Sequence, residues 1–84
     1  MGGRVMKIRL NMIEEIMKFI NGCCSKFTGK IFAEQSNQKI NAKSVLGLYS
    51  LDLSKPILVR IDTDDKNEEN KFYEFVKQWK VDGE

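Results

Sequence analysis

The stretch that decides the fold is Asn41-Ala-Lys-Ser-Val-Leu-Gly-Leu-Tyr-Ser-Leu-Asp-Leu53, near the middle of the chain. Ser44 stands where a helix N-cap is expected, because its hydroxyl can accept a hydrogen bond from the first turn. The apolar residues after it predict one or two helical turns, although Gly47 weakens a helix at that point. This stretch therefore predicts a short helix.

The chain around this helix predicts four strands. Residues Val5 to Leu10 alternate between an apolar and a basic face, which is typical of a half-buried strand. Lys30 to Gln35 and Lys39 to Ala42 form a predicted hairpin around the polar turn at Asn37. The apolar and β-branched run from Ile57 to Ile61 predicts a buried strand.

Two longer helices are predicted from apolar residues at helical spacing. The first opens with a predicted capping box, in which Asn11 accepts from the first turn and Glu14 reaches back. Asp65 and Glu68 form an equivalent box for the second. The first helix has a predicted apolar stripe of Ile13, Ile16, Met17, Ile20, Cys24 and Phe27, while Gly22 is expected on its solvent face. The stripe of the second helix contains Phe72, Phe75, Val76 and Trp79.

These elements occur in the order strand, helix, strand, strand, short helix, strand, helix. Two long helices and one short helix on one face of a four-stranded, mainly antiparallel sheet would bury each apolar stripe. The sequence therefore predicts an α+β open-faced sandwich. At 84 residues, it forms one domain over residues 1–84.

Charge, hydropathy and residue types exclude several classes of function. Fourteen basic and twelve acidic residues are spread along the chain, so we expect no nucleic-acid partner. No apolar run approaches the length of a membrane span and no signal region is recognisable, which predicts a cytoplasmic protein with no membrane partner. No acid/base pair or phosphate loop suggests an enzyme, and we expect no cofactor.

The cysteines and the acidic cluster predict no metal site. The chain has no histidine, and adjacent Cys23 and Cys24 lack the spacing of a zinc site. Helical geometry predicts that Cys24 is buried in the apolar stripe and that Cys23 lies on its flank. Asp62, Asp64 and Asp65 lack EF-hand spacing, and they are interpreted as turn and cap residues.

The segment Lys43-Ser44-Val45-Leu46-Gly47-Leu48-Tyr49-Ser50-Leu51 resembles the serine-centred motif of the HPr family, the histidine-containing phosphocarriers of the sugar phosphotransferase system (PTS). The element order also fits, as does Ser25-Lys26-Phe27 at the end of the first helix. The resemblance implies the HPr-like open-faced sandwich. It covers most of the chain and is most specific in the middle.

The resemblance also locates the position of the carrier histidine, which opens the first helix in the family. Counting back from Ser25 places Ile13 there, followed by Glu14 and Glu15. Ile13 offers no nucleophile, and the two carboxylates would repel an incoming phosphoryl dianion. We therefore expect no phosphohistidine transfer and no catalytic residue.

Ser44 aligns with the serine that a dedicated kinase phosphorylates in many relatives. It has two interpretations: a regulatory phosphorylation site, or only an N-cap worth about 1 kcal/mol. By the same resemblance, the candidates for partner binding are Leu46 and Tyr49, together with Lys43 and Phe19. Ordinary packing against the core is the alternative for the apolar members of this set.

Two functions remain open from the sequence. The first is an HPr-like PTS protein that docks to a PTS enzyme, an HPr kinase or a transcriptional regulator, with Ser44 as a switch. The second is an HPr-fold binding module for a partner unrelated to sugar transport, whose contact surface is not specified and can include Phe19 and Tyr73.

Overall fold

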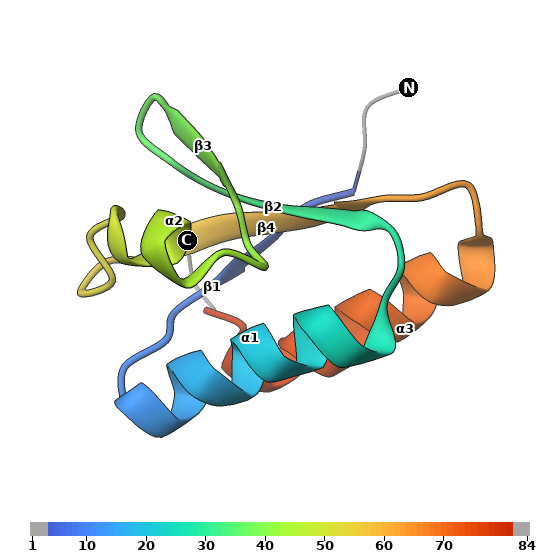
Figure 1. The fold of residues 1–84 in the computed structure, drawn as a ribbon, viewed down its shortest axis with the longest axis horizontal. Coiled ribbons are helices and arrows are strands. Elements are labelled where there is room, and N and C mark those ends of the chain that lie inside the picture. The colour runs from blue at the N-terminus through green and yellow to red at the C-terminus, as the bar shows by residue number, and fades with distance from the viewer. Residues whose placement is uncertain (1–3, 82–84) are drawn as a thin grey trace.

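A four-stranded antiparallel sheet with two helices across one face organises the chain (Figure 1). The computed structural model describes residues 4–81, so both ends of the predicted domain, residues 1–3 and 82–84, lie outside the described residues. The elements are β1 (Met6–Ile8), α1 (Ile13–Lys26), β2 (Lys30–Gln35), β3 (Gln38–Asn41), α2 (Val45–Tyr49), β4 (Ile57–Asp62), α3 (Lys66–Val76) and the 3-10 turn η1 (Lys77–Trp79).

The sheet has the strand order β1-β4-β2-β3, and every neighbouring pair is antiparallel. Val59 in β4 is central, because it pairs with Met6 of β1 on one side and with Ala33 of β2 on the other. Alternate residues of β4 point to opposite faces, so Val59 is buried while Leu58 is exposed. The prediction of a buried strand here is confirmed on one face only.

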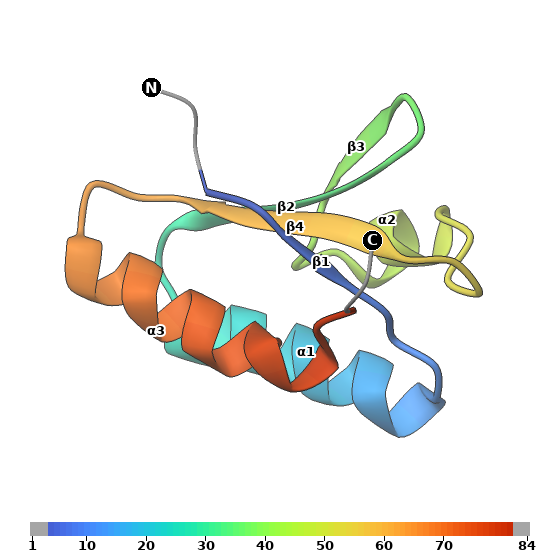
Figure 2. The same cartoon turned by 180° about the vertical axis from the view of Figure 1, so that it is seen from behind.

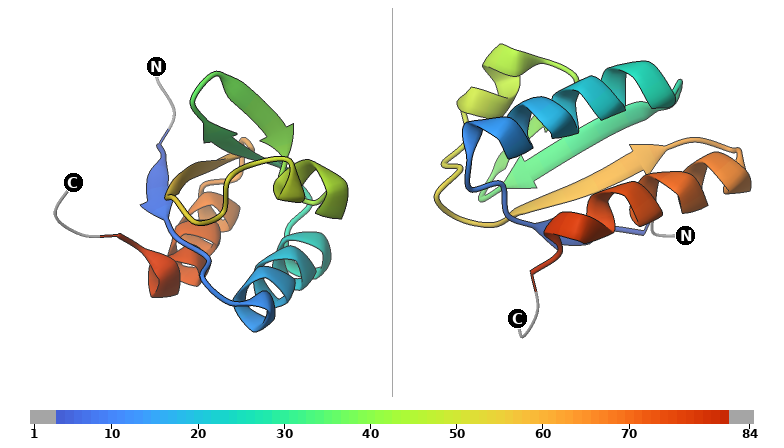
Figure 3. Two further views of the ribbon diagram at one scale, coloured as in Figure 1. Left: turned by 90° about the vertical axis from the view of Figure 1, so that its left-hand side faces the viewer. Right: turned by 90° about the horizontal axis from the view of Figure 1, so that it is seen from below.

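The helices α1 and α3 run side by side beneath the sheet, and the opposite face carries none of the described helices (Figures 2 and 3). The short helix α2 lies beside the sheet near β3. The core between sheet and helices contains Ile8, Phe19, Ile31, Val59 and Phe72, all fully buried. The predicted HPr-like open-faced sandwich is confirmed.

The apolar stripe of α1 lies at a different angle from the predicted one. The buried residues of α1 and its C-cap are Ile16, Phe19, Ile20, Gly22, Cys23 and Phe27. Ile13, Met17 and Cys24 are exposed instead. At about 100° per residue, the centre of this face is rotated by about 65° from the centre of the predicted one. Apolar residues cover more of α1 than the core needs, so packing against the sheet and α3 selects among them.

Gly22 lies where α1 and α3 approach each other, and not on the predicted solvent face. A Cβ at this position would overlap the ring of Phe75. The missing side chain therefore makes room for an aromatic ring against the backbone of α1. The close approach is compatible with the observed orientation of α1, which buries both Gly22 and Phe19.

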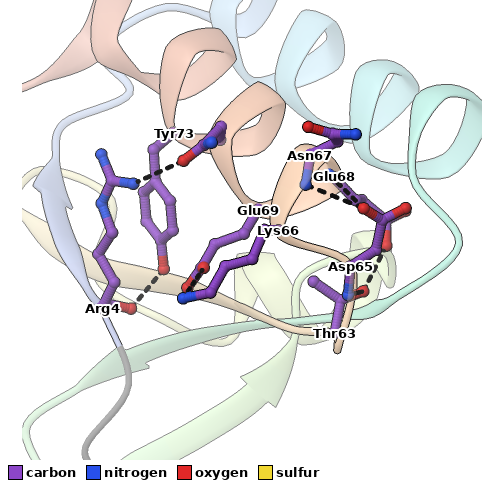
Figure 4. A network of polar contacts seen from close by, with 9 residues as sticks. Arg4, Thr63, Asp65, Lys66, Asn67, Glu68, Glu69 and Tyr73 are labelled. Atoms are coloured by element: carbon purple, nitrogen blue, oxygen red, sulfur yellow. Dashed lines mark hydrogen bonds and ion pairs between the residues drawn. The ribbon is translucent and has the colours of Figure 1, made fainter.

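Both predicted capping boxes differ in detail. The N-cap of α1 is Met12, and the carboxylate that reaches back belongs to Glu15, not Glu14. At α3, Asp65 accepts from the backbone of Asn67 (2.9 Å) and Glu68 (3.3 Å), as expected of an N-cap (Figure 4).

Glu68 does not complete the box at α3, because its carboxylate binds groups elsewhere. It accepts from the backbone N–H of Thr28 (2.6 Å) and Gly29 (3.3 Å) and from the Thr63 hydroxyl (2.7 Å). These bonds, the Thr63 hydroxyl first among them, lower the pKa of Glu68 to about 2. Glu68 thereby joins the α1–β2 turn to the start of α3.

The ends of the described chain are anchored to the fold. The Tyr73 hydroxyl donates to the Arg4 carbonyl, and the Arg4 guanidinium lies 4.4 Å from the Tyr73 ring centroid (Figure 4). Tyr73 is therefore buried and is not available as a contact residue. At the other end, the N–H of Val81 donates to the Lys7 carbonyl (3.0 Å), which covers the outer edge of β1. No helix within residues 4–81 has the length and apolar character needed to cross a membrane.

Candidate functional site

The segment around Ser44 forms the short helix that the sequence predicts. Ser44 is the N-cap of α2, and its hydroxyl accepts from the backbone N–H of Gly47 (3.1 Å). The Ser44 carbonyl accepts from the N–H of Leu48 (2.9 Å), and the backbone N–H of Ser44 donates to the Asn41 carbonyl (3.0 Å). Ser44 is half-buried at the start of α2. Its predicted role as an N-cap is confirmed.

The apolar residues of α2 divide between core and solvent. Leu48 is fully buried and attaches α2 to the body of the protein, whereas Leu46 is 84% exposed and Tyr49 is 49% exposed. Both predicted contact residues on α2 are therefore accessible. A helix of five residues can turn only one side towards the core, so the apolar side chains on its other sides remain in solvent.

Lys43 is held within the chain and does not project freely. Its ammonium donates to the Phe27 carbonyl (3.0 Å), at the C-cap of α1. A cation there stabilises the negative end of the helix dipole. In addition, the Cys24 thiol lies 3.7 Å from the Lys43 carbonyl. These two contacts tie the end of α1 to the segment that carries Ser44.

The start of α1, where the resemblance places the carrier histidine, has no nucleophile. Ile13 is the first residue of α1 and is 67% exposed. The Glu15 carboxylate accepts from the backbone N–H groups of Asn11 (2.7 Å) and Met12 (3.1 Å) just before the helix. Glu14 adds a second, solvent-exposed carboxylate to this end. The local chemistry thus favours cations over phosphate.

Exposed apolar side chains from α1 and α2 lie on the same side of the molecule. Ile13, Met17 and Cys24 lie close to one line along α1 by helical geometry, and the contact of Cys24 with the Lys43 carbonyl shows that this line faces the α2 segment. Figure 3 shows α2 beside the first half of α1. We call Ile13, Met17, Leu46 and Tyr49 the α1–α2 apolar surface.

A hollow of about 460 Å³ separates the start of α1 from the end of α2. Asn11 and Ile16 line it from the α1 side, and Tyr49 lines it from α2. Phe19, in contrast, is fully buried and packs edge-on against Trp79, with ring centroids 5.9 Å apart. It does not extend this surface, and its alternative interpretation as a core residue is correct.

The cysteines have the opposite burial from the predicted one. Burial raises the pKa of the Cys23 thiol to about 12, so this thiol stays protonated at neutral pH. Cys24 is exposed at the edge of the α1–α2 apolar surface. Within residues 4–81, no cluster of three or more cysteine or acidic side chains is arranged to hold a metal ion.

Comparison with known proteins identifies relatives of this chain. A family model described as "PTS HPr component phosphorylation site" matches residues 14–79. The HPr-like protein Crh of Halalkalibacterium halodurans is 36% identical over 45 residues, which is 54% of either chain, so the match spans about half the length of that relative.

A solved structure has the same fold. It is described as the crystal structure of HPr-C-His from Thermoanaerobacter tengcongensis, with a TM-score of 0.70, 26% identity and 93% coverage of both chains. The family match over most of the chain agrees with this fold and with the Ser44 segment. The chain belongs to the HPr family of the sugar phosphotransferase system, whose members are phosphocarriers that work with protein partners.

Proposed function

We propose that this protein is a regulatory or docking member of the HPr family that does not carry a phosphoryl group on histidine. The observation that carries this proposal is the exposed Ile13 at the first residue of α1, in a chain without histidine. Phosphoryl transfer needs a nucleophile at that point, and the neighbouring Glu14 and Glu15 disfavour a dianion. The activity is therefore binding, and the protein is not an enzyme.

The α1–α2 apolar surface is the proposed docking site. Leu46 at 84% exposure and Ile13 at 67% leave two large apolar side chains in water. Such a cluster, bordered by polar residues, is typical of a protein contact, and burying it provides the driving force for binding. The partner is a cytoplasmic PTS enzyme, an HPr kinase or a transcriptional regulator that recognises HPr.

Ser44 is the proposed switch of this docking site. A phosphate on its hydroxyl would add nearly two negative charges two residues before Leu46, at the positive end of α2. The phosphate oxygens can keep the hydrogen bond from the Gly47 N–H, which is now 3.1 Å from the hydroxyl. Phosphorylation would then change the charge of the docking site without unfolding α2.

A second candidate is a binding module whose partner is unrelated to sugar transport. The exposed Glu14 carboxylate favours it, because it makes the surface beside Ile13 less cationic. On this alternative, the protein binds no PTS protein and no HPr kinase. Ser44 then acts only as the cap of α2.

One experiment separates the two candidates. The protein is incubated with ATP and an HPr serine kinase, and its intact mass is compared with that of Ser44→Ala. A gain of one phosphate that is lost in Ser44→Ala supports the regulatory HPr function. No gain, while authentic HPr is modified in parallel, favours the second candidate.

Titration calorimetry against PTS proteins tests the docking site directly. Leu46→Ala should weaken binding, because Leu46 is exposed on the proposed site. Leu58→Ala is the matched control, since Leu58 is 38% exposed on the open face of the sheet. Equal losses for both variants would contradict a site on α2.

A further inference from the structure

The outer seam between α1 and α3 contains two depressions, and Met17 is the one residue of the α1–α2 apolar surface that lines either of them. Gly22 has no side chain, so the ring of Phe75 lies against the backbone of α1. Phe75 then forms a wall shared by two adjacent depressions along the seam. The arrangement of the two helices is visible in Figure 2.

The larger depression, which we call the α1–α3 groove, has a volume of about 630 Å³. It is lined by Lys26, Phe27, Asn70, Lys71, Glu74 and Phe75. The rings of Phe27 and Phe75, with centroids 5.9 Å apart, form its apolar part. This volume is within the range of sites for small ligands, and it is too small for a folded partner.

The charged residues of the groove leave two cations without an acidic partner. Among residues 4–81, neither Lys26 nor Lys71 forms an ion pair, whereas Glu74 pairs with Lys77 at 3.3 Å. The Lys26 ammonium lies 4.9 Å from the centroid of the Phe75 ring, which places a positive charge directly beside the apolar wall.

The end of α1 also contributes to the local charge. A helix C-terminus is negative and would oppose an anion. Here the Lys43 ammonium donates to the Phe27 carbonyl (3.0 Å), which offsets this negative end. The groove therefore combines an aromatic wall with a net positive rim.

We propose that the α1–α3 groove binds a small organic anion with a flat apolar ring. The ring lies against Phe75, and the acid group is held between Lys26 and Lys71. The side-chain amide of Asn70, whose oxygen accepts from Arg4 (3.4 Å), retains N–H groups that can donate to the same acid group.

The test uses 1-naphthoate as the probe, with the full chain labelled with nitrogen-15 and amide shifts followed by NMR. Saturable shifts at Lys26, Asn70, Lys71 and Phe75, with a Kd on the order of 1 mM, are expected for a ligand of this size. Lys26→Gln and Lys71→Gln should each raise the Kd about two- to fivefold, as for exposed ion pairs.

Two controls make the result decisive. Lys55→Gln removes the same charge from an exposed position outside both depressions and should leave the Kd unchanged. The neutral analogue 1-naphthalenemethanol has the same ring and should bind more weakly. The proposal is overturned if the neutral analogue binds equally well, if the shifts lie elsewhere, or if both groove variants keep the original Kd in spectra that show an intact fold.

Discussion

Gly22→Ala tests the contact between the backbone of α1 at Gly22 and the ring of Phe75 in α3. In an unobstructed helix this substitution stabilises the folded state by about 1 kcal/mol, because alanine favours the helix and restricts the unfolded chain. Here the added Cβ overlaps the Phe75 ring, so the ring must move. The sign of the effect therefore depends on the cost of that movement.

The aromatic contacts of Phe75 set the magnitude. Its ring lies 5.9 Å from Phe27 and 5.3 Å from Trp79, centroid to centroid. Such pairs contribute about 0.5–1.5 kcal/mol each, and overpacking costs about 1–3 kcal/mol. An overpacking cost of about 2 kcal/mol exceeds the helix gain of about 1 kcal/mol. Gly22→Ala should therefore lower the free energy of unfolding by about 1 kcal/mol.

The assay is urea unfolding, followed by circular dichroism and by the fluorescence of Trp79, the single tryptophan. A double-mutant cycle with Phe75→Leu isolates the clash, because a smaller side chain should make Gly22→Ala less harmful. The reasoning is refuted if Gly22→Ala alone stabilises the protein by about 1 kcal/mol, or if the two substitutions are additive.

Three other predictions follow from single sites. Gly47→Ala should stabilise the protein by about 0.5–1 kcal/mol in the same urea assay, because its Cβ would meet other atoms at an ordinary 3.4 Å; destabilisation would mean that α2 is not helical there. The lowered pKa of Glu68 stabilises the fold above pH 4.5, and this contribution is lost as the pH falls towards about 2. Glu68→Gln should therefore flatten the acid limb of a stability–pH curve, and an unchanged limb would contradict the bonds to Thr63 and Thr28. Iodoacetamide should modify Cys24 in the folded protein and both thiols in urea, as measured by mass; modification of Cys23 first would contradict its burial.

Local signals in the sequence predicted the elements well. The alternation from Val5 to Leu10, the β-branched run at Ile57 and the aromatic spacing after Asp65 each mark an element whose type depends on a few neighbouring residues. The N-cap at Ser44 is equally local, since its acceptor and donor are three residues apart. The order of these elements was sufficient to predict the sheet with its helices on one face.

Long-range contacts explain what the pattern could not predict. Glu68 was expected to reach back to its own N-cap, but the N–H of Thr28, forty residues away, binds it instead. Lys43 stays a predicted partner-binding residue, and the pattern did not predict that its ammonium donates to the Phe27 carbonyl, which ends α1. In both cases a charged side chain bound unpaired backbone groups that only the folded chain brings near it.

By itself, the sequence determined the class of fold, the missing histidine and the position of Ile13 at the start of α1. Only the tertiary structure decided which side of α1 is buried, because its apolar residues extend around more of the helix than one face. The observed orientation buries Phe19 and Cys23, leaves Ile13 in solvent and brings the backbone of Gly22 against the ring of Phe75. Helical spacing is a local property, whereas the rotation of a helix about its axis depends on the elements packed against it.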